Sequence, residues 1–203
     1  MLLTVLAVFV VVVWVQVLTK SSQVASTTNC PPPTAATGSA TIDVGAPPAE
    51  LGTKVASDAL EKTAPAAPKA TQVRVLNANG QRGQASLVAA QLSQLGFGAA
   101  PDKASGNDTV YTSQNMQCQA QIRFGPAGAA SARTVELLVP CAELIQDNRK
   151  DGGVDLALGT AFTALNSDGS ASSVLAALTK HAVDPQAPAP DAAAVSAVHN
   201  VSC

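Results

Sequence analysis

The chain has few charged residues. Asp, Glu, Lys and Arg make up 13% of its 203 residues, about half the share of an average protein, and the formal net charge is −2. Residues 71–165 hold seven basic and seven acidic side chains, whose charges sum to zero. The sequence therefore lacks the basic surface that nucleic-acid binding needs, and bulk attraction of a polyanion is excluded as a main force.

Signatures of common catalytic and cofactor sites are also missing. There is no GxGxxG motif and no Walker lysine, so nucleotide binding is unsupported. Both histidines, His181 and His199, follow the central region, which leaves that region without a nucleophile–base pair for hydrolysis. His199 and Cys203 are four residues apart, but one such pair is a poor metal site. We therefore predict a non-enzymatic protein with no catalytic residues, no cofactor and no metal.

None of the four cysteines belongs to a CxxC motif, which argues against zinc ribbons and thioredoxin-like redox sites. Their even number favours disulfides in an oxidising compartment. A strand and a helix between Cys118 and Cys141 would each cover ~20 Å in opposite directions, which brings both cysteines to one end. We expect a Cys118–Cys141 disulfide, with buried free thiols as the alternative. For Cys30 and Cys203 we expect a second disulfide, with intermolecular pairing or a free thiol as alternatives.

Proline divides the chain into segments. Ten of the 13 prolines lie in residues 31–68 and 185–190. The stretch between these regions is long enough for one small domain with a single core. We predict four parts: a transmembrane anchor at 1–20, a Pro/Ala-rich stalk at 21–70, a domain at 71–165, and a C-terminal helix and tail at 166–203.

The predicted anchor rests on residues 2–18, which carry no charge. As a helix they would reach ~26 Å, barely the thickness of the hydrocarbon core of a bilayer. A cleaved signal peptide with a site near residues 24–26 is the alternative. Lys20, the one flanking charge, would place the rest of the chain in the cytoplasm, but the cysteines favour the opposite side. We therefore predict a single-pass membrane protein whose C-terminal domain is extracytoplasmic.

Hydrophobic periodicity in the domain predicts the order β-α-β-β-α-β. Strands are expected at 73–77, 97–100, 119–124 and 154–159, with helices at 84–95 and 127–139. This order is typical of the split βαβ arrangement, an α+β fold in which a four-stranded sheet carries both helices on one face. On the open face, Arg74, Arg123 and Asp155 would then form cross-strand charge pairs. A further short amphipathic helix is expected at 172–180.

Two glycine-containing turns connect a strand to a helix and are the candidate ligand sites. Helix N-termini attract anions through free N–H groups and the helix dipole, so a phosphate- or carboxylate-bearing ligand could bind there. We expect the two turns to lie side by side. The alternative is that the glycines only form turns and that Asn79 tolerates a left-handed conformation. The candidate ligand-binding residues are Asn77, Asn79, Gly80, Arg82, Gly83, Arg123 and Gly125.

The segment V-R-V-L-N-A-N-G-Q-R-G at 73–83, followed by I-R-F-G-P-A-G at 122–128 and V-D-L-A-L-G-T-A-F-T-A-L at 154–165, resembles the LytR C-terminal domain family of bacterial envelope proteins. The resemblance covers nearly half of the chain. It implies a membrane-anchored, non-catalytic factor that supports cell envelope integrity, with a wall glycopolymer or an envelope protein as its partner and no nucleic acid. An accessory subunit of a wall-modifying enzyme, or such an enzyme itself, is the alternative.

Overall fold

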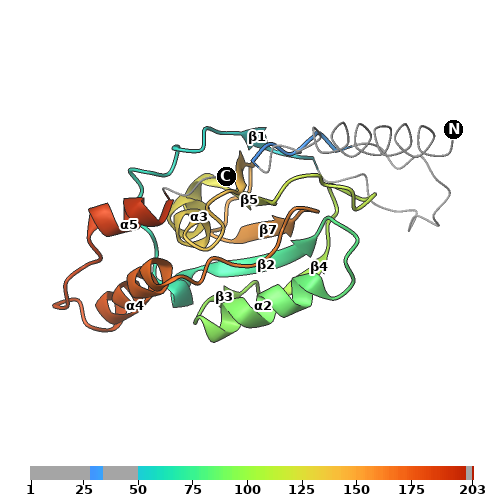
Figure 1. Ribbon diagram of the computed structural model, residues 1–203. Helices are drawn as coiled ribbons and strands as arrows, with labels where there is room; N and C mark the ends of the chain where they lie inside the picture. Colours follow the sequence, from blue (N-terminus) through green and yellow to red (C-terminus); the bar gives the residue numbers. More distant parts are fainter. Residues whose placement is uncertain (1–27, 34–49, 200–202) are drawn as a thin grey trace, which may run out of the picture.

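The computed structural model describes residues 28–33, 50–199 and 203 (Figure 1). Within these residues it contains a mixed sheet of seven strands and four α-helices. The helices are α2 (Gln84–Gln94), α3 (Ala129–Glu136), α4 (Gly169–Val183) and α5 (Ala192–His199), with short 3₁₀ segments η1 (Pro68–Ala70) and η2 (Pro126–Gly128). The strands are β1 (Thr53–Lys54), β2 (Gln72–Asn77), β3 (Gly98–Ala99), β4 (Ser105–Asn107), β5 (Ala120–Phe124), β6 (Glu143–Gln146) and β7 (Val154–Leu158).

Strand directions determine where the turns lie. The order across the sheet is β1-β6-β5-β7-β2-β3, and β4 also pairs with β2. β2 is parallel to β3, β4 and β7, whereas β7 is antiparallel to β5. β6 is parallel to β5 and antiparallel to β1. Consequently β2 and β5 run in opposite directions, and their carboxyl ends lie at opposite ends of the sheet.

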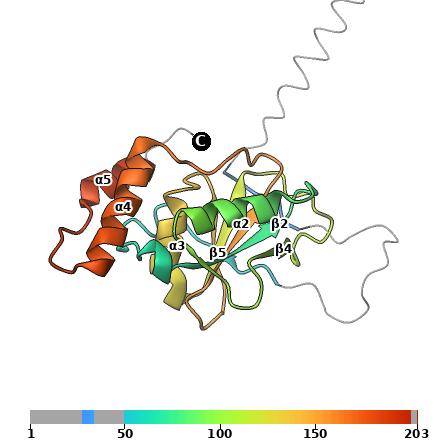
Figure 2. The same cartoon turned by 90° about the horizontal axis from the view of Figure 1, so that it is seen from below.

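The helices pack on one face of the sheet. Alternate residues of the central strands, among them Val75, Ile122 and Leu156, are buried and join a single apolar cluster with α2 and α3. Figures 1 and 2 show α2 crossing this face and α4 lying beside α5 at one end. The apolar residues that the helices contribute to the cluster include Val88, Leu92, Ala132, Val135, Leu175, Leu178, Val195 and Val198.

A loop, not a helix, covers much of the opposite face. Residues 108–118 place Tyr111 and Met116 against the sheet with 1% and 0% of their surface exposed. The loop is joined to the sheet because Met116 N donates to the carbonyl oxygen of Ala78 (2.9 Å) and Thr160 N donates to that of Met116 (2.8 Å). This second apolar cluster consists of Leu76, Ala78, Val110, Tyr111, Met116, Cys118 and Ala157.

The predicted four-stranded split βαβ sheet is wrong. The sequence patterns miss β1, β4 and β6, which have two, three and four residues, because strands this short show too little alternation to recognise. The strands on either side of α2 are also neighbours, since β2 pairs directly with β3 and β4. In a split arrangement another strand would lie between them.

The predicted transmembrane helix at 1–20 lies outside the described residues, as do residues 21–27 and 34–49 of the predicted stalk. No helix in the described part is long and apolar enough to cross a membrane. From residue 50 onward the stretch predicted as stalk is folded: β1 pairs with β6 at the sheet edge, and Leu60 is 4% exposed.

All four cysteines form disulfides, but the predicted pairing is wrong. The bonds are Cys30–Cys118 and Cys141–Cys203. A Cys118–Cys141 bond would require both ends of the β5–α3 unit to meet. The ends do return to one side, since β6 runs parallel to β5 and Glu143 pairs with Gln121. Cys118 instead faces the second cluster, where Cys30 packs against it.

We predict that replacing both Cys30 and Cys118 by Ser lowers the free energy of unfolding by roughly 3–5 kcal/mol, because the bond spans 88 residues and restricts the unfolded chain. Urea unfolding under non-oxidising handling, followed by circular dichroism, measures the change. A loss below about 1 kcal/mol would show that attachment of the N-terminal segment contributes little to the free energy of unfolding.

Candidate functional site

The turn after β2 is built around two glycines. Gly80 and Gly83 have φ angles of 75° and 80°, a left-handed conformation that glycine adopts without the Cβ penalty. Asn77 stabilises the turn, since its side-chain nitrogen donates to the carbonyl oxygen of Gln81 (3.0 Å). Helix α2 then begins after Gly83 without a side-chain cap. The N–H of Gln84 donates to the carbonyl oxygen of Gln81 (3.3 Å). The following N–H groups, of Ala85 and Ser86, have no side-chain cap and face the start of the helix.

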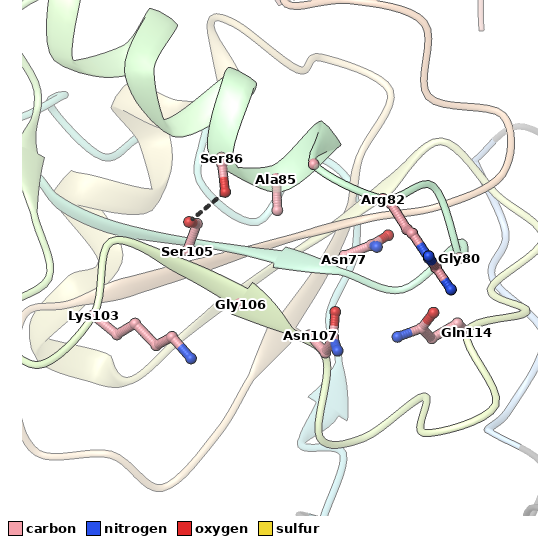
Figure 3. Close-up of a pocket in the computed structure, with 11 residues that line it drawn as sticks. Asn77, Gly80, Arg82, Ala85, Ser86, Lys103, Ser105, Gly106, Asn107 and Gln114 are labelled. Carbon is pink, nitrogen blue, oxygen red and sulfur yellow. Dashed lines mark hydrogen bonds between the residues drawn. The ribbon is translucent and has the colours of Figure 1, made fainter. Parts of the chain in front are cut away.

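This turn forms one side of a polar hollow of about 650 Å³. The other side comes from β4 and the following loop. The Oγ atoms of Ser86 on α2 and Ser105 on β4 are 3.1 Å apart across its base. Figure 3 shows Arg82 near Gln114 at one end and Lys103 at the other. The lining residues are Asn77, Gly80, Arg82, Gly83, Ala85, Ser86, Lys103, Ser105, Gly106, Asn107 and Gln114.

The hollow is electropositive because of its lining. Of the described residues that line it, two are basic and none is acidic. Arg82 and Lys103 are exposed, and neither belongs to an ion pair among the described residues. Amide and hydroxyl groups fill the space between them. Such a site can donate several hydrogen bonds to an anionic, hydroxylated molecule and offers no charged acceptor to a cation.

Four of the seven predicted ligand residues line this hollow: Asn77, Gly80, Arg82 and Gly83. Asn79 belongs to the same turn but has a supporting position. Its side-chain nitrogen donates to Oε1 of Gln84 (2.6 Å) and to the carbonyl oxygen of Gly159 (2.8 Å). Asn79 thereby links the turn to α2 and to the end of β7.

The second glycine turn does not lie beside the first, so that expectation is wrong. It follows β5, which runs antiparallel to β2, and thus occupies the opposite end of the sheet. The loop 149–153 packs against it. A Cβ at Gly125 would collide with the backbone carbonyl of Arg149, so this glycine permits a close approach of two backbones. Gly125 is not part of the hollow.

Arg123 lies on the loop-covered face of the sheet and is 4% exposed. Its Nη1 is 2.8 Å from Oδ2 of Asp108, and its Nη2 donates to Oε1 of Gln121 (2.9 Å). The guanidinium carbon is 5.8 Å from the ring centroid of Tyr111. This arrangement joins β5 to the covering loop and leaves Arg123 inaccessible to a ligand.

The buried polar cluster continues toward residues 28–33. The side-chain nitrogen of Gln121 donates to Oε2 of Glu143 (2.8 Å), and Tyr111 Oη donates to the carbonyl oxygen of Pro31 (2.7 Å). Burial raises the pKa of the Tyr111 hydroxyl, so this donor stays protonated at neutral pH. The N-terminal segment is thus attached by a hydrogen bond as well as by the Cys30–Cys118 bond.

Beyond this cluster, half-buried ion pairs extend along the same face. The predicted Arg74–Asp155 pair is confirmed, with Nε 2.9 Å from Oδ1. Arg123 pairs with Asp108 rather than with Asp155; Arg149 takes its place, 2.8 Å from Asp155 and 2.7 Å from Asp147. Burial alone would raise the pKa of Asp147, but the hydrogen bonds and charge of Arg149 outweigh it and lower the pKa.

The described residues contain no group of three side chains able to hold a metal ion. Neither histidine lines the hollow. His181 Nδ1 is 2.7 Å from the carbonyl oxygen of Ala187, and His199 Nδ1 is 3.6 Å from Oε1 of Glu136. Burial raises the pKa of Glu136, although Arg133 donates to it (2.6 Å).

Sequence reasoning misses the second side of the hollow. Lys103, Ser105, Asn107 and Gln114 belong to a polar stretch with no periodicity, and nothing in that stretch shows that residues 105–107 pair with β2. Gln114 has a φ of 51°, which is unusual for a residue other than glycine. This angle is known only from the structure, so it gives no signal in the sequence.

These features define an α+β module with a polar, cationic hollow at a strand–helix turn. The chain belongs to the LytR C-terminal domain family, as its sequence motifs predict. A profile of this family, described as LytR cell envelope-related transcriptional attenuator, matches residues 70–162. The match spans the structure from η1 to the residues just after β7.

Two relatives extend this result beyond the family domain. The chain is 41% identical over 198 residues to the cell envelope integrity protein Cei of Mycobacterium tuberculosis. The aligned residues cover 98% of this chain and 85% of that protein. It is 42% identical to the crystallised soluble domain of a conserved hypothetical secreted protein from Mycobacterium marinum, with a TM-score of 0.67 over 76% of this chain and 100% of that one. The protein is therefore an envelope-related member of its family.

We predict that Asp108→Asn destabilises the fold by about 3–5 kcal/mol, because the Arg123 guanidinium is then buried without its carboxylate. Asp102→Asn is the matched control. Asp102 also pairs with an arginine, Arg74, at 2.8 Å, but its side chain is 61% exposed, so the expected loss is under about 1 kcal/mol. Chemical denaturation of both variants measures the difference; equal losses would contradict the importance assigned to the buried pair.

The lowered pKa of Asp147 gives a prediction for acid stability. A carboxyl whose folded-state pKa lies below its ordinary value of 3.8 stabilises the fold at higher pH, and this contribution is lost as the pH falls through the folded-state pKa. We expect Asp147→Asn to be less stable than the wild type at neutral pH and to lose less stability below about pH 4. Thermal unfolding across pH 2–7 tests this; parallel curves would refute it.

Proposed function

We propose that this protein supports cell envelope integrity by binding an anionic wall polymer in the hollow between α2 and β4. The observation that carries the proposal is the pair of exposed cations, Arg82 and Lys103, at the two ends of a cavity with no acidic residue among its described lining. Because the chain as a whole is slightly acidic, the attraction has to be local to this site.

The chemistry of the lining favours a phosphate- or carboxylate-bearing glycan. The two cations would bind two anionic groups, and charge-assisted hydrogen bonds of this kind contribute about 1.5–3 kcal/mol each. Asn107, Gln114 and the serine hydroxyls would hydrogen bond to sugar hydroxyls. The uncapped first turn of α2 adds N–H donors on the same side.

The proposed location is the outer side of the cell membrane. The uncharged stretch 2–18 would anchor the chain by a single pass, and two disulfides among the described residues fit an oxidising compartment. The similarity to an envelope integrity protein and to a secreted protein supports the same placement.

The proposed activity is binding without catalysis. The lining of the hollow includes no histidine, cysteine or carboxylate among the described residues. Its two serines, Ser86 and Ser105, are 3.1 Å from each other, so each hydroxyl is paired with a hydroxyl and not with one of these bases. Turnover of a wall precursor by the purified protein would overturn this proposal. An accessory role toward a wall-modifying enzyme predicts instead that crosslinking in envelopes captures that enzyme while glycan binding is absent.

We predict that Arg82→Gln combined with Lys103→Gln weakens the binding of purified acidic wall fragments at least ~10-fold, the equivalent of 1.4 kcal/mol. Isothermal titration calorimetry measures affinity, and amide chemical shifts of Ala85 and Ser86 report the position of the ligand. Cells that carry this variant should be as sensitive to envelope stress as cells without the protein.

Lys62→Gln combined with Lys69→Gln is the matched control, because it removes the same charge from exposed positions outside the hollow. The control is expected to bind as the wild type does. Equal weakening in both pairs of substitutions would mean that net charge, and not this cavity, governs binding.

A further inference from the structure

The two disulfides differ in how well solvent can reach them. Cys118 is 0% exposed and lies within the second apolar cluster, with Cys30 packed against that cluster. Cys141 is half-buried and Cys203 is exposed. Thiol–disulfide exchange requires an incoming thiolate to reach one of the sulfurs. Cys30 and Cys141 are both half-buried, so the two bonds differ in their other cysteine. Cys118 is enclosed by the fold, whereas Cys203 is open to attack.

The accessible bond borders a cavity of its own. A hollow of about 430 Å³ is lined by Cys141 and Cys203 together with residues 54–57, 140–144 and His199. This volume is within the usual range of small-molecule sites. It lies away from the hollow between α2 and β4, and the two share no lining residue.

The charges at this cavity permit the approach of an anion. Three titratable side chains face it: Lys54, Glu143 and His199. Nζ of Lys54 is 2.7 Å from Oε1 of Glu143, so the one lining carboxylate is already paired. His199 is similarly placed next to Glu136, at 3.6 Å. Among the described lining side chains, an incoming thiolate would thus meet no unpaired carboxylate.

We propose that Cys141–Cys203 is a thiol-exchange site for a small thiol, whereas Cys30–Cys118 is a lasting structural bond. The external thiolate attacks Sγ of Cys203, the more exposed of the two residues. A bond forms between the two sulfurs, the Cys141–Cys203 bond breaks, and Sγ of Cys141 leaves as a thiolate that takes a proton from water. The product is a mixed disulfide on Cys203; no net oxidation or reduction occurs in this step.

Exchange at this position leaves the rest of the fold in place. The side chains of Val195 and Val198 keep α5 packed on the main apolar cluster, and Cys30–Cys118 continues to hold the loop that covers the sheet. The reaction therefore adds the group carried by the thiol to the surface next to α5. Because this site is separate from the ligand hollow, the proposal does not depend on the proposed function.

Glutathione is a suitable probe for the full-length oxidised protein. We expect incubation at neutral pH, acid quenching, alkylation and peptide mass mapping to show glutathione on Cys203 and an alkylated Cys141. Both should appear at least ~10-fold faster than any modification of Cys30 or Cys118. In urea, where the fold no longer shields either bond, the rates should converge.

Three outcomes would overturn the proposal. Equal rates at the two bonds in the folded protein, or earlier modification of Cys30 or Cys118, would remove the distinction between them. Glutathione on Cys141 in place of Cys203 would contradict the assigned direction of attack. A tenfold difference that persists in urea would mean that the fold is not its cause.

Discussion

The ion pair between Arg123 and Asp108 is the contact on which the rest of the arrangement depends. Each face of a sheet is either covered by other parts of the protein or exposed to water. Here helices cover one face, and only an irregular loop covers much of the other. The backbone N–H and C=O groups of such a loop have no regular hydrogen bonds of a strand or helix. Asp108 supplies some of them, because its Oδ1 accepts hydrogen bonds from the backbone nitrogens of Val110 (2.6 Å) and Tyr111 (2.8 Å). Its Oδ2 forms the ion pair with Arg123. One carboxylate thus shapes the loop and attaches it to β5. Because the same loop carries Gln114 to the hollow, a buried interaction on β5 sets the position of one side of the site.

The second constraint is strand direction. β7 pairs antiparallel with β5 and parallel with β2, so the two strand–turn–helix units point in opposite directions. Their turns cannot combine into one larger anion site, although their sequences look alike. The first turn remains open because the hollow separates it from β4 and Gln114. The second is filled by the backbone of residues 149–153. The same local motif therefore gives a cavity at one end of the sheet and a packed junction at the other.

Much of the local structure could be predicted from the sequence. The long strands, the two helices of the central region, the glycine turn after β2, the family and the Arg74–Asp155 pair all follow from periodicity, turn chemistry or motif. The left-handed conformation weighed for Asn79 instead belongs to Gly80 and Gly83. The short strands could not be predicted. β1 and β4 have only two and three residues, and they are strands because they pair with β6 and β2, which their own sequences do not indicate. The disulfide pairing failed for a related reason: equal strand and helix lengths say where Cys118 and Cys141 could meet, but not that Cys118 is buried under a loop. Arg123 looked available because a sheet face opposite helices is often exposed, and the residues that cover it carry no periodic signal.

The bond between Cys30 and Cys118 has a mechanical consequence. Tension applied to the chain ahead of residue 30 would pass through sulfur into the start of β5, at the middle of the sheet, and would bypass the 87 residues in between. The edge strand β1 pairs with β6 through two residues, and a hydrogen bond from Lys54 to Asn29 connects it directly to the chain ahead of Cys30. The covalent path would therefore pull the sheet from its centre and not peel it from its edge strand.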